Sequence, residues 1–299
     1  MKKMYVIWMM VFCALASGQT FGQAGMDTLE LTGESTDTII ANRLLLEMRQ
    51  LFNEKKIDEA KRKGEQALTI YLKLTGEDNV SVATIFSIRS GIEYVNGNYS
   101  KTIELGEKSL KILLNKIGDS SQLIINAYVN LGNAYVANGE YDKALECYNN
   151  SLEVTKKLFG ESTYNLALPY YNLGYVYYNI GDYNKSIFWA EKVLEIQSDS
   201  PGPPKNPISK SMCYNLIGIA YYSMDNNEEA IKYLNESIKY TPENMKTGNI
   251  NLCYTYNNLS NCYNEIGEYD KAIESLNISL DLFLKIQNQD HPDIILFYN

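Results

Sequence analysis

Apolar and polar positions along most of this chain recur at a fixed spacing that predicts helix pairs. A segment with a Gly turn followed by Tyr and Lys occurs three times in nearly the same form, at 138–144, 180–186 and 266–272. With weaker copies added, its Tyr position falls at residues 57, 99, 141, 183, 227 and 269, in steps of 42, 42, 42, 44 and 42. No strand-like alternation accompanies this period. A constant period of this length predicts a helical solenoid built from one repeated unit.

Each unit is expected to contain two helices that cross closely. With the repeated Tyr numbered as position 17, apolar or aromatic residues recur at positions 4, 7 and 11 with a small residue at position 8, and these positions share one helical face. The clearest examples of this first helix, helix A, are 128–135, 170–177, 214–221 and 256–263. Small residues at position 8, and at positions 20 and 27 after the turn, predict a second helix, helix B, packed tightly against it.

This set of positions resembles the tetratricopeptide repeat, in the 42-residue kinesin-light-chain-like form found in many bacterial proteins. The resemblance covers about residues 41–299 and is most specific from Tyr128 onward. It implies an all-α fold, a right-handed superhelical solenoid of antiparallel helix pairs. The first two units match less well, because Glu47 and Arg89 stand where Leu is expected and Glu93 where Tyr is expected. An amino-terminal cap or a coincidental helix pair is the alternative for those units.

The amino terminus has the features of a cleavable secretory signal. Lys2 and Lys3 precede an apolar run, Met4–Leu15, and small residues follow it. A membrane anchor or a buried helix is the alternative, but the run has about 12 residues where a span needs about 20. Cleavage after Ala16 or after Ala24 fits equally well. Export from the cytoplasm, to the periplasm or the medium, is therefore expected.

The expected organisation is a signal peptide at 1–24, a disordered acidic linker at 25–38 and the repeat array at 39–299. The array contains six units and the start of a seventh, because Ile294 to Tyr298 begin another helix A. From this unfinished unit we predict that the sequence is part of a longer protein, with docking of the segment on the sixth pair or on a second copy as the alternative. The 44-residue step predicts a stiff loop that contains four prolines, namely Pro201, Pro203, Pro204 and Pro207.

The charge balance removes several classes of function. The chain has 27 basic and 36 acidic residues, a net charge of −9, and loss of the two leader lysines gives −9 − 2 = −11. Such a chain repels nucleic acids and anionic membranes, so neither nucleic-acid binding nor membrane insertion of the array is expected. The one histidine, His291, falls in a loop that resembles the family's inter-repeat loop. No catalytic set, metal site or cofactor is expected, and the protein is predicted not to be an enzyme.

Four cysteines remain after the leader, and we interpret them as buried free thiols. They are Cys147, Cys213, Cys253 and Cys262. Cys253 and Cys262 lie roughly 13 Å apart along one predicted helix, beyond disulfide reach. A disulfide between the other pairs stays open. Cys13, in the leader, lacks the small preceding residue that lipidation needs.

The resemblance places the binding surface on the concave groove, lined by helix A positions 2, 5, 6, 9, 12 and 13. These positions are rich in amide and aromatic side chains, and the predicted contacts are Asn130, Asn133, Tyr171, Asn172, Tyr175, Asn215, Asn257, Asn258 and Asn261. An asparagine pairs with any peptide backbone, and tyrosine adds contact area. The alternative is that each Asn only satisfies neighbouring backbone or water. Replacing Asn133 and Asn257 by Ala is expected to weaken binding and leave folding nearly unchanged.

Two functions fit this surface. The first is a non-catalytic exported scaffold that binds a protein or an extended peptide in the groove. The second is the sensor or input region of a longer signalling protein or CHAT-type peptidase, with its effector beyond residue 299. Positions 2, 5 and 6 hold no Lys or Arg, so the family's carboxylate clamp for chaperone tails is not expected.

Overall fold

The protein is all-α over the residues that its structure, a computed structural model, describes: 35–161, 163–199, 208–242 and 249–286. These residues form twelve α-helices and one short 3-10 helix, with no strand among them. The expected all-α helical repeat solenoid is confirmed. The expected signal peptide, the proline loop and the start of a seventh unit lie outside the described residues.

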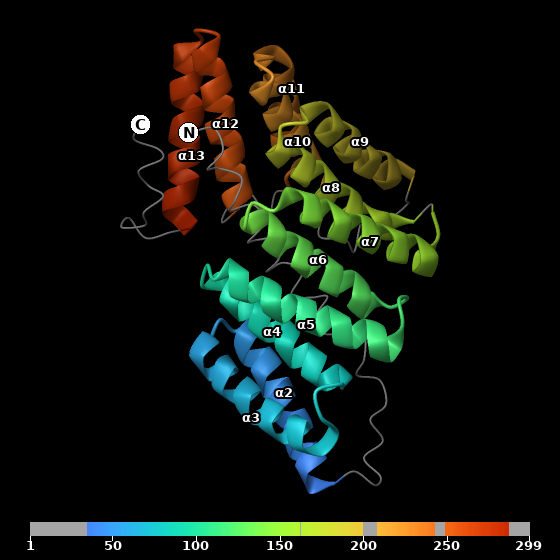
Figure 1. Ribbon diagram of the computed structural model, residues 1–299. Helices are drawn as coiled ribbons and strands as arrows, with labels where there is room; N and C mark the ends of the chain where they lie inside the picture. Colours follow the sequence, from blue (N-terminus) through green and yellow to red (C-terminus); the bar gives the residue numbers. More distant parts are fainter. Residues whose placement is uncertain (1–34, 162, 200–207, 243–248, 287–299) are drawn as a thin grey trace. The chain divides into compact units, whose positions relative to one another are not determined.

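The described helices fall into two compact units, each with three antiparallel helix pairs (Figure 1). The first unit consists of α2 (Thr36–Asn53) with α3 (Ile57–Thr75), α4 (Val80–Val95) with α5 (Tyr99–Ile117), and α6 (Gln122–Ala137) with α7 (Tyr141–Phe159). The second consists of η2 (Tyr164–Leu166), α8 (Ala167–Ile180) with α9 (Tyr183–Asp199), α10 (Lys210–Ser223) with α11 (Asn227–Lys239), and α12 (Ile250–Glu265) with α13 (Tyr269–Ile286). The even-numbered helices are helix A and the odd-numbered helices are helix B of the six expected units.

The first pair begins earlier than expected and accommodates its unusual residues by ion pairing. Ser35 caps α2 by accepting a hydrogen bond from the Thr38 backbone N–H at 3.3 Å, so residues 36–38, expected in the linker, are helical. Glu47, which stands where Leu is expected, pairs with Lys63 of α3 at 2.5 Å and with Arg43 at 3.1 Å. The chain therefore keeps the helix-pair geometry although the sequence departs from the repeat pattern.

The turn from helix A to helix B keeps one backbone conformation in both units. Four of the six turns place a glycine at φ between 76° and 96°, namely Gly97, Gly139, Gly181 and Gly267. The first and fifth pairs place Lys55 at φ 61° and Asp225 at φ 59° in the same position. A residue with a side chain is strained in this left-handed conformation. Since Lys55 and Asp225 adopt it nevertheless, the turn geometry is set by the packing of the helices and not by glycine alone.

Helix A and helix B of a pair cross where one residue is small and its partner large. A Cβ at Gly132 would lie 2.6 Å from the Tyr148 ring, and one at Gly218 would lie 2.8 Å from Leu234 Cγ. In the first pair the large residue, Met48, is on helix A and the small one, Gly64, is on helix B. A Cβ at Gly64 would lie 2.6 Å from the Met48 side chain. The first pair therefore departs from the pattern of a small residue at position 8, and Gly64 compensates for Met48.

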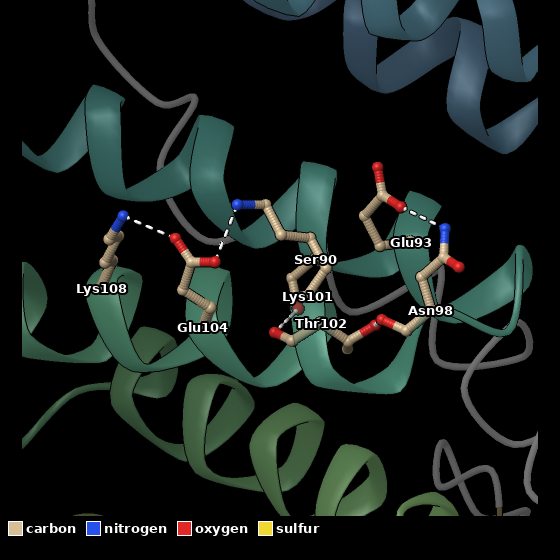
Figure 2. Close-up of polar contacts among 7 residues, drawn as sticks. All are labelled: Ser90, Glu93, Asn98, Lys101, Thr102, Glu104 and Lys108. Carbon is tan, nitrogen blue, oxygen red and sulfur yellow. Dashed lines mark hydrogen bonds and ion pairs between the residues drawn. The ribbon is translucent and has the colours of Figure 1, made fainter.

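Buried serines connect the two helices of a pair through backbone carbonyls. At position 8 of the second pair, Ser90 donates to the carbonyl of Thr102 at 2.8 Å (Figure 2). Similar bonds run from Ser260 to Ala272 (2.8 Å), Ser109 to Ala83 (2.7 Å), Ser237 to Ser211 (2.8 Å) and Ser279 to Cys253 (2.5 Å). The small residues expected at positions 8 and 27 therefore also supply hydrogen bonds across the close contact.

In the second helix pair, polar and charged side chains form hydrogen bonds and ion pairs along α5 and at its start. Figure 2 shows Glu104 between Lys101 at 2.7 Å and Lys108 at 2.8 Å, and these hydrogen bonds lower the pKa of Glu104 to about 2. Asn98 donates to Glu93 at 2.7 Å, next to the turn. Asn98 and the two lysines are exposed and the two glutamates are partly exposed, so these pairs favour solubility more than stability.

Candidate functional site

Six of the nine predicted groove residues are buried in the folded chain. Tyr175 is 1% exposed, and the exposed fractions of the other five lie between 4% and 7%. Those five are Asn133, Tyr171, Asn172, Asn215 and Asn257. The remaining three, Asn130, Asn258 and Asn261, are partly exposed. The nine residues therefore do not form one uniformly accessible surface.

Two of the buried asparagines take part in hydrogen bonds within the protein. Tyr148 of α7 donates its hydroxyl to Asn133 Oδ1 at 2.6 Å. Asn215 of α10 donates its Nδ2 to Thr255 Oγ1 of α12 at 2.7 Å. Both bonds connect helices, so these asparagines position the helices that form the groove, whatever else they contact.

Asn172 is buried with an unpaired donor. It is 5% exposed, and its Nδ2 has no hydrogen-bond partner among the described residues. A buried N–H without an acceptor costs about 1–3 kcal/mol.

The accessible part of the predicted groove lies on α6 in the first unit and on α12 in the second. Asn258 and Asn261 are three residues apart on α12, so they share one helical face. Asn130 lies on α6. The side chains of these three partly exposed residues make no hydrogen bond to the part of the chain that the structure describes. Their amides are therefore available to donate to and accept from a ligand.

A further polar contact joins two helix A groove faces in the second unit. The hydroxyl of Tyr178 of α8 lies 3.2 Å from Ser223 Oγ of α10, and the Tyr178 ring lies 5.6 Å from the Tyr183 ring. Asn179 donates its Nδ2 to the Tyr175 carbonyl at 2.8 Å. Burial raises the pKa of the Tyr178 hydroxyl. This tyrosine stays protonated at neutral pH and acts only as a hydrogen-bonding and packing group.

Many of the 25 tyrosines serve packing within the pairs instead of the groove. In three pairs a helix B lysine lies over the helix A tyrosine at position 11, at 5.0 to 5.7 Å from the ring centre: Lys143 over Tyr135, Lys185 over Tyr177 and Lys271 over Tyr263. In the fifth pair Tyr214 stacks between Tyr233 and Tyr240. The repeat period in the sequence predicts these reused positions, whereas the lysine contacts are visible only in the structure.

The cysteines are buried free thiols, as the sequence predicts. Burial raises the pKa of Cys147 and of Cys253 to about 12, and it also raises that of Cys213. These thiols stay protonated at neutral pH, and catalysis by a thiolate has no support from them.

Charged groups in the described ranges offer no concentrated site. A cleft of about 370 Å³ in the first unit is lined by Asp119, Lys157 and neighbouring charged residues, and Lys157 pairs with Asp119 at 2.9 Å. Across the described helices there is no cluster of three metal-ligating side chains. Nor is any described helix long and apolar enough to cross a membrane.

Arg49 on α2 is the one basic residue at a groove position of the first pair. Its side chain is partly buried, and its Nε has no hydrogen-bond acceptor among the described residues. Burial lowers the pKa of this guanidinium. It does not lose its charge at neutral pH, so it adds a single positive group to an acidic protein.

Comparisons with known proteins agree with this geometry. A family model described as tetratricopeptide repeat matches residues 123–199, and a second model with the same description matches 213–244 and 254–282. A search of the curated proteins finds no match.

Three solved structures illustrate the fold similarity. A putative kinesin light chain of Podospora anserina with nearly identical TPR-like repeats has a TM-score of 0.55 and 18% identity, over 71% of this chain and 99% of that one. The apo form of the quorum sensor NprR from B. thuringiensis has a TM-score of 0.70 and 15% identity, over 89% of this chain and 71% of that one. The third is a Signal Transduction ATPase with Numerous Domains (STAND) protein from Pyrococcus horikoshii, which has a tetratricopeptide repeat sensor. Its TM-score is 0.63 and its identity 18%, over 92% of this chain and 41% of that one. At these identities the similarity establishes the fold alone.

Proposed function

We propose that this chain, a tetratricopeptide repeat protein, is a non-catalytic exported scaffold. It binds a protein or an extended peptide on its groove faces. Repeats of this kind are protein-interaction scaffolds. Asn258 and Asn261 carry the proposal, because their partly exposed amides have no partner in the described protein. An amide both donates and accepts, so two amides one helical turn apart pair with the backbone of a ligand whatever its side chains.

Several properties favour a binding role over catalysis. The tetratricopeptide repeat fold is typically a non-catalytic scaffold. The buried cysteines and Tyr178 keep their protons at neutral pH, and the chain contains a single histidine, His291. A net charge of −9 disfavours a nucleic-acid ligand. A polypeptide is therefore the ligand class that suits these surfaces best.

The binding role is tested with Asn258→Ala/Asn261→Ala and the polypeptide partner isolated from the native host. Losing two ligand hydrogen bonds should weaken the affinity by more than about 1 kcal/mol, or at least about fivefold in Kd. Isothermal titration calorimetry measures this change. Asn277→Ala, an exposed asparagine on helix B of the same pair, is the matched control and should leave Kd unchanged. A double variant that binds as tightly as the wild type would contradict the groove assignment.

Export is the part of the proposal supported by sequence only, through Lys2, Lys3 and the short apolar run that follows. The protein recovered from its native host is expected to begin between residues 17 and 25 and to be absent from the cytoplasmic fraction. Intact-mass spectrometry of that protein measures the start. Recovery of chains that keep Met1 would show that the leader is not cleaved.

A second candidate is the sensor region of a signalling protein. It is favoured by fold similarity to a quorum sensor and to a tetratricopeptide repeat sensor of a STAND protein. Both candidates place a polypeptide on the groove faces, and they differ in whether an effector domain is encoded beyond residue 299. Reading the gene past that codon separates them, since an effector domain in the same frame favours the sensor and its absence favours the scaffold.

A further inference from the structure

Arg49 on α2 carries a charge that no other group of the described protein neutralises. Its side chain is partly buried, its Nε has no hydrogen-bond acceptor, and it forms no ion pair with the described residues. Burial lowers the pKa of the guanidinium, because desolvation disfavours the charged form. Arginine keeps its charge in proteins, so an unpaired and partly buried guanidinium costs the free protein stability.

The two carboxylates nearest to Arg49 in the sequence are engaged by other cations. Glu47 pairs with Lys63 at 2.5 Å, and Glu54 pairs with Lys56 at 2.7 Å. No acidic residue stands three or four positions from Arg49 on α2, where a helical ion pair would form. The described protein therefore offers Arg49 no carboxylate of its own.

Helix B of the first pair also lacks the polar partner that position 9 has in the third pair. There, Asn133 at position 9 accepts a hydrogen bond from the hydroxyl of Tyr148 at position 24, at 2.6 Å. In the first pair position 24 is Gly64, which leaves space for Met48 and supplies no side chain. The arrangement that accommodates Met48 therefore leaves Arg49 without a polar side chain at position 24.

Apolar side chains flank Arg49 on its own side of the helix. Leu46 and Phe52 lie three residues before and after it on α2. Leu46 is 46% exposed, and Phe52 is partly exposed. The Phe52 ring reaches α4, where a Cβ at Gly91 would lie 3.0 Å from it. This face of α2 therefore offers one cation between accessible apolar side chains, next to α4.

The first two helix pairs also differ from the rest of the chain in charge. All four arginines of the chain lie there, namely Arg43, Arg49, Arg62 and Arg89. Residues 36–117 contain 13 basic and 11 acidic residues, so their net charge is 13 − 11 = +2, whereas the whole chain has −9. An anionic group of a ligand is therefore attracted to this part of the array more than to the rest of it.

We propose that Arg49 binds a carboxylate of the polypeptide ligand, with apolar groups next to that carboxylate packed on Leu46 and Phe52. This assignment rests on the proposed function, which supplies the polypeptide. A carboxylate offers the planar guanidinium two acceptor oxygens and the missing counter-charge. The site uses position 9 of one helix A, whereas the chaperone-type clamp uses positions 2, 5 and 6, which hold no Lys or Arg. The carboxylate comes from a chain terminus or from an acidic side chain of the ligand.

Nuclear magnetic resonance of the arginine Nε–H groups tests the site with small probes. The chain has four such groups, and the variants Arg49→Gln and Arg62→Gln assign the two that matter. The probes are N-acetyl-leucine, whose carboxylate imitates a chain terminus, and N-acetylglutamic acid α-amide, whose carboxylate imitates an acidic side chain. The Arg49 signal should shift to saturation, with a dissociation constant at least about fivefold below that of the exposed Arg62 on α3.

The probe that binds Arg49 more tightly identifies the source of the carboxylate in the ligand. N-acetyl-leucinamide has the same apolar group without the charge, and it should leave the Arg49 signal in place. Equal responses of Arg49 and Arg62 to both acids, or an equal shift from the uncharged amide, would overturn the proposal.

The polypeptide partner isolated from the native host provides the second measurement. Arg49→Gln should weaken its binding by at least about fivefold in Kd, and added salt should narrow the difference from the wild type. Arg62→Gln is the matched control and should leave Kd unchanged. Because Arg49 has no internal partner, Arg49→Gln should not lower the melting temperature. A lower melting temperature would show that the guanidinium stabilises the fold, and it would overturn the proposal.

The two proposals fail in different ways. If Asn258→Ala/Asn261→Ala weakens partner binding and Arg49→Gln does not, the binding function stands and the carboxylate site is wrong. If neither change affects partner binding, the groove assignment is contradicted, and the titration of Arg49 with the two acids still decides whether this residue binds a carboxylate.

Discussion

Replacing Gly218 by methionine is expected to lower the free energy of unfolding by about 2–3 kcal/mol, because a Cβ there would lie 2.8 Å from Leu234 Cγ and 3.2 Å from the Leu234 backbone nitrogen. Leu234→Gly removes a fully buried side chain and should cost about 4 kcal/mol. The double variant recreates the arrangement of Met48 and Gly64 in the first pair. Its loss should be about 2 kcal/mol smaller than the sum of the two single losses.

Urea denaturation of the four proteins, followed by circular dichroism, measures this coupling. Gly218→Met combined with Leu105→Gly, a buried position of the first unit, is the control, and its two losses should add. If the losses for Gly218→Met and Leu234→Gly simply add, the large residue on one helix does not compensate for the small one on the other, and this explanation of the Met48 and Gly64 arrangement is wrong.

Replacing Asn133 by alanine is expected to lower the free energy of unfolding by about 0.5–1.5 kcal/mol, because it removes the buried hydrogen bond from the Tyr148 hydroxyl to Asn133 Oδ1. This differs from the expectation from sequence that Asn133→Ala leaves folding nearly unchanged. Thermal and urea unfolding measure the effect.

Asn130→Ala is the matched control for this change, since Asn130 lies on the same helix, is partly exposed and makes no hydrogen bond to the described chain. It should alter stability by less than about 0.5 kcal/mol. Tyr148→Phe should cost a similar amount to Asn133→Ala, and the two changes together little more than either alone. Equal stability of Asn133→Ala and the wild type would show that the bond contributes nothing.

The sequence predicts the fold well because the repeat averages over local irregularities. The turn recurs six times at nearly constant spacing, so its conformation could be predicted even at Lys55 and Asp225, where glycine is missing. Both residues adopt the left-handed conformation in the structure. Glu47 shows the same rule, because an ion pair to Lys63 replaces the expected Leu contact without a change of architecture.

The candidate site was less predictable, because position in the repeat does not reveal what a side chain bonds to. Asn133 and Asn130 differ by three residues on one helix, yet only Asn133 meets a tyrosine hydroxyl from helix B. That partner exists because the large residue that packs against Gly132 in this unit, at position 24 of helix B, is Tyr148. Whether an asparagine is bonded therefore depends on residues that follow it by fifteen positions, as for Asn133, or by forty, as for Asn215, outside any local pattern.

Site-specific photocrosslinking in the native host tests the central claim, binding of a polypeptide on the groove faces, most directly. A photoreactive residue is placed singly at Asn261 on helix A of the sixth pair and at Asn277 on helix B of the same pair. The account predicts a discrete polypeptide adduct at position 261 and none at 277. Adducts at 277 without one at 261 would contradict it, since the partner would then contact helix B and not the groove face.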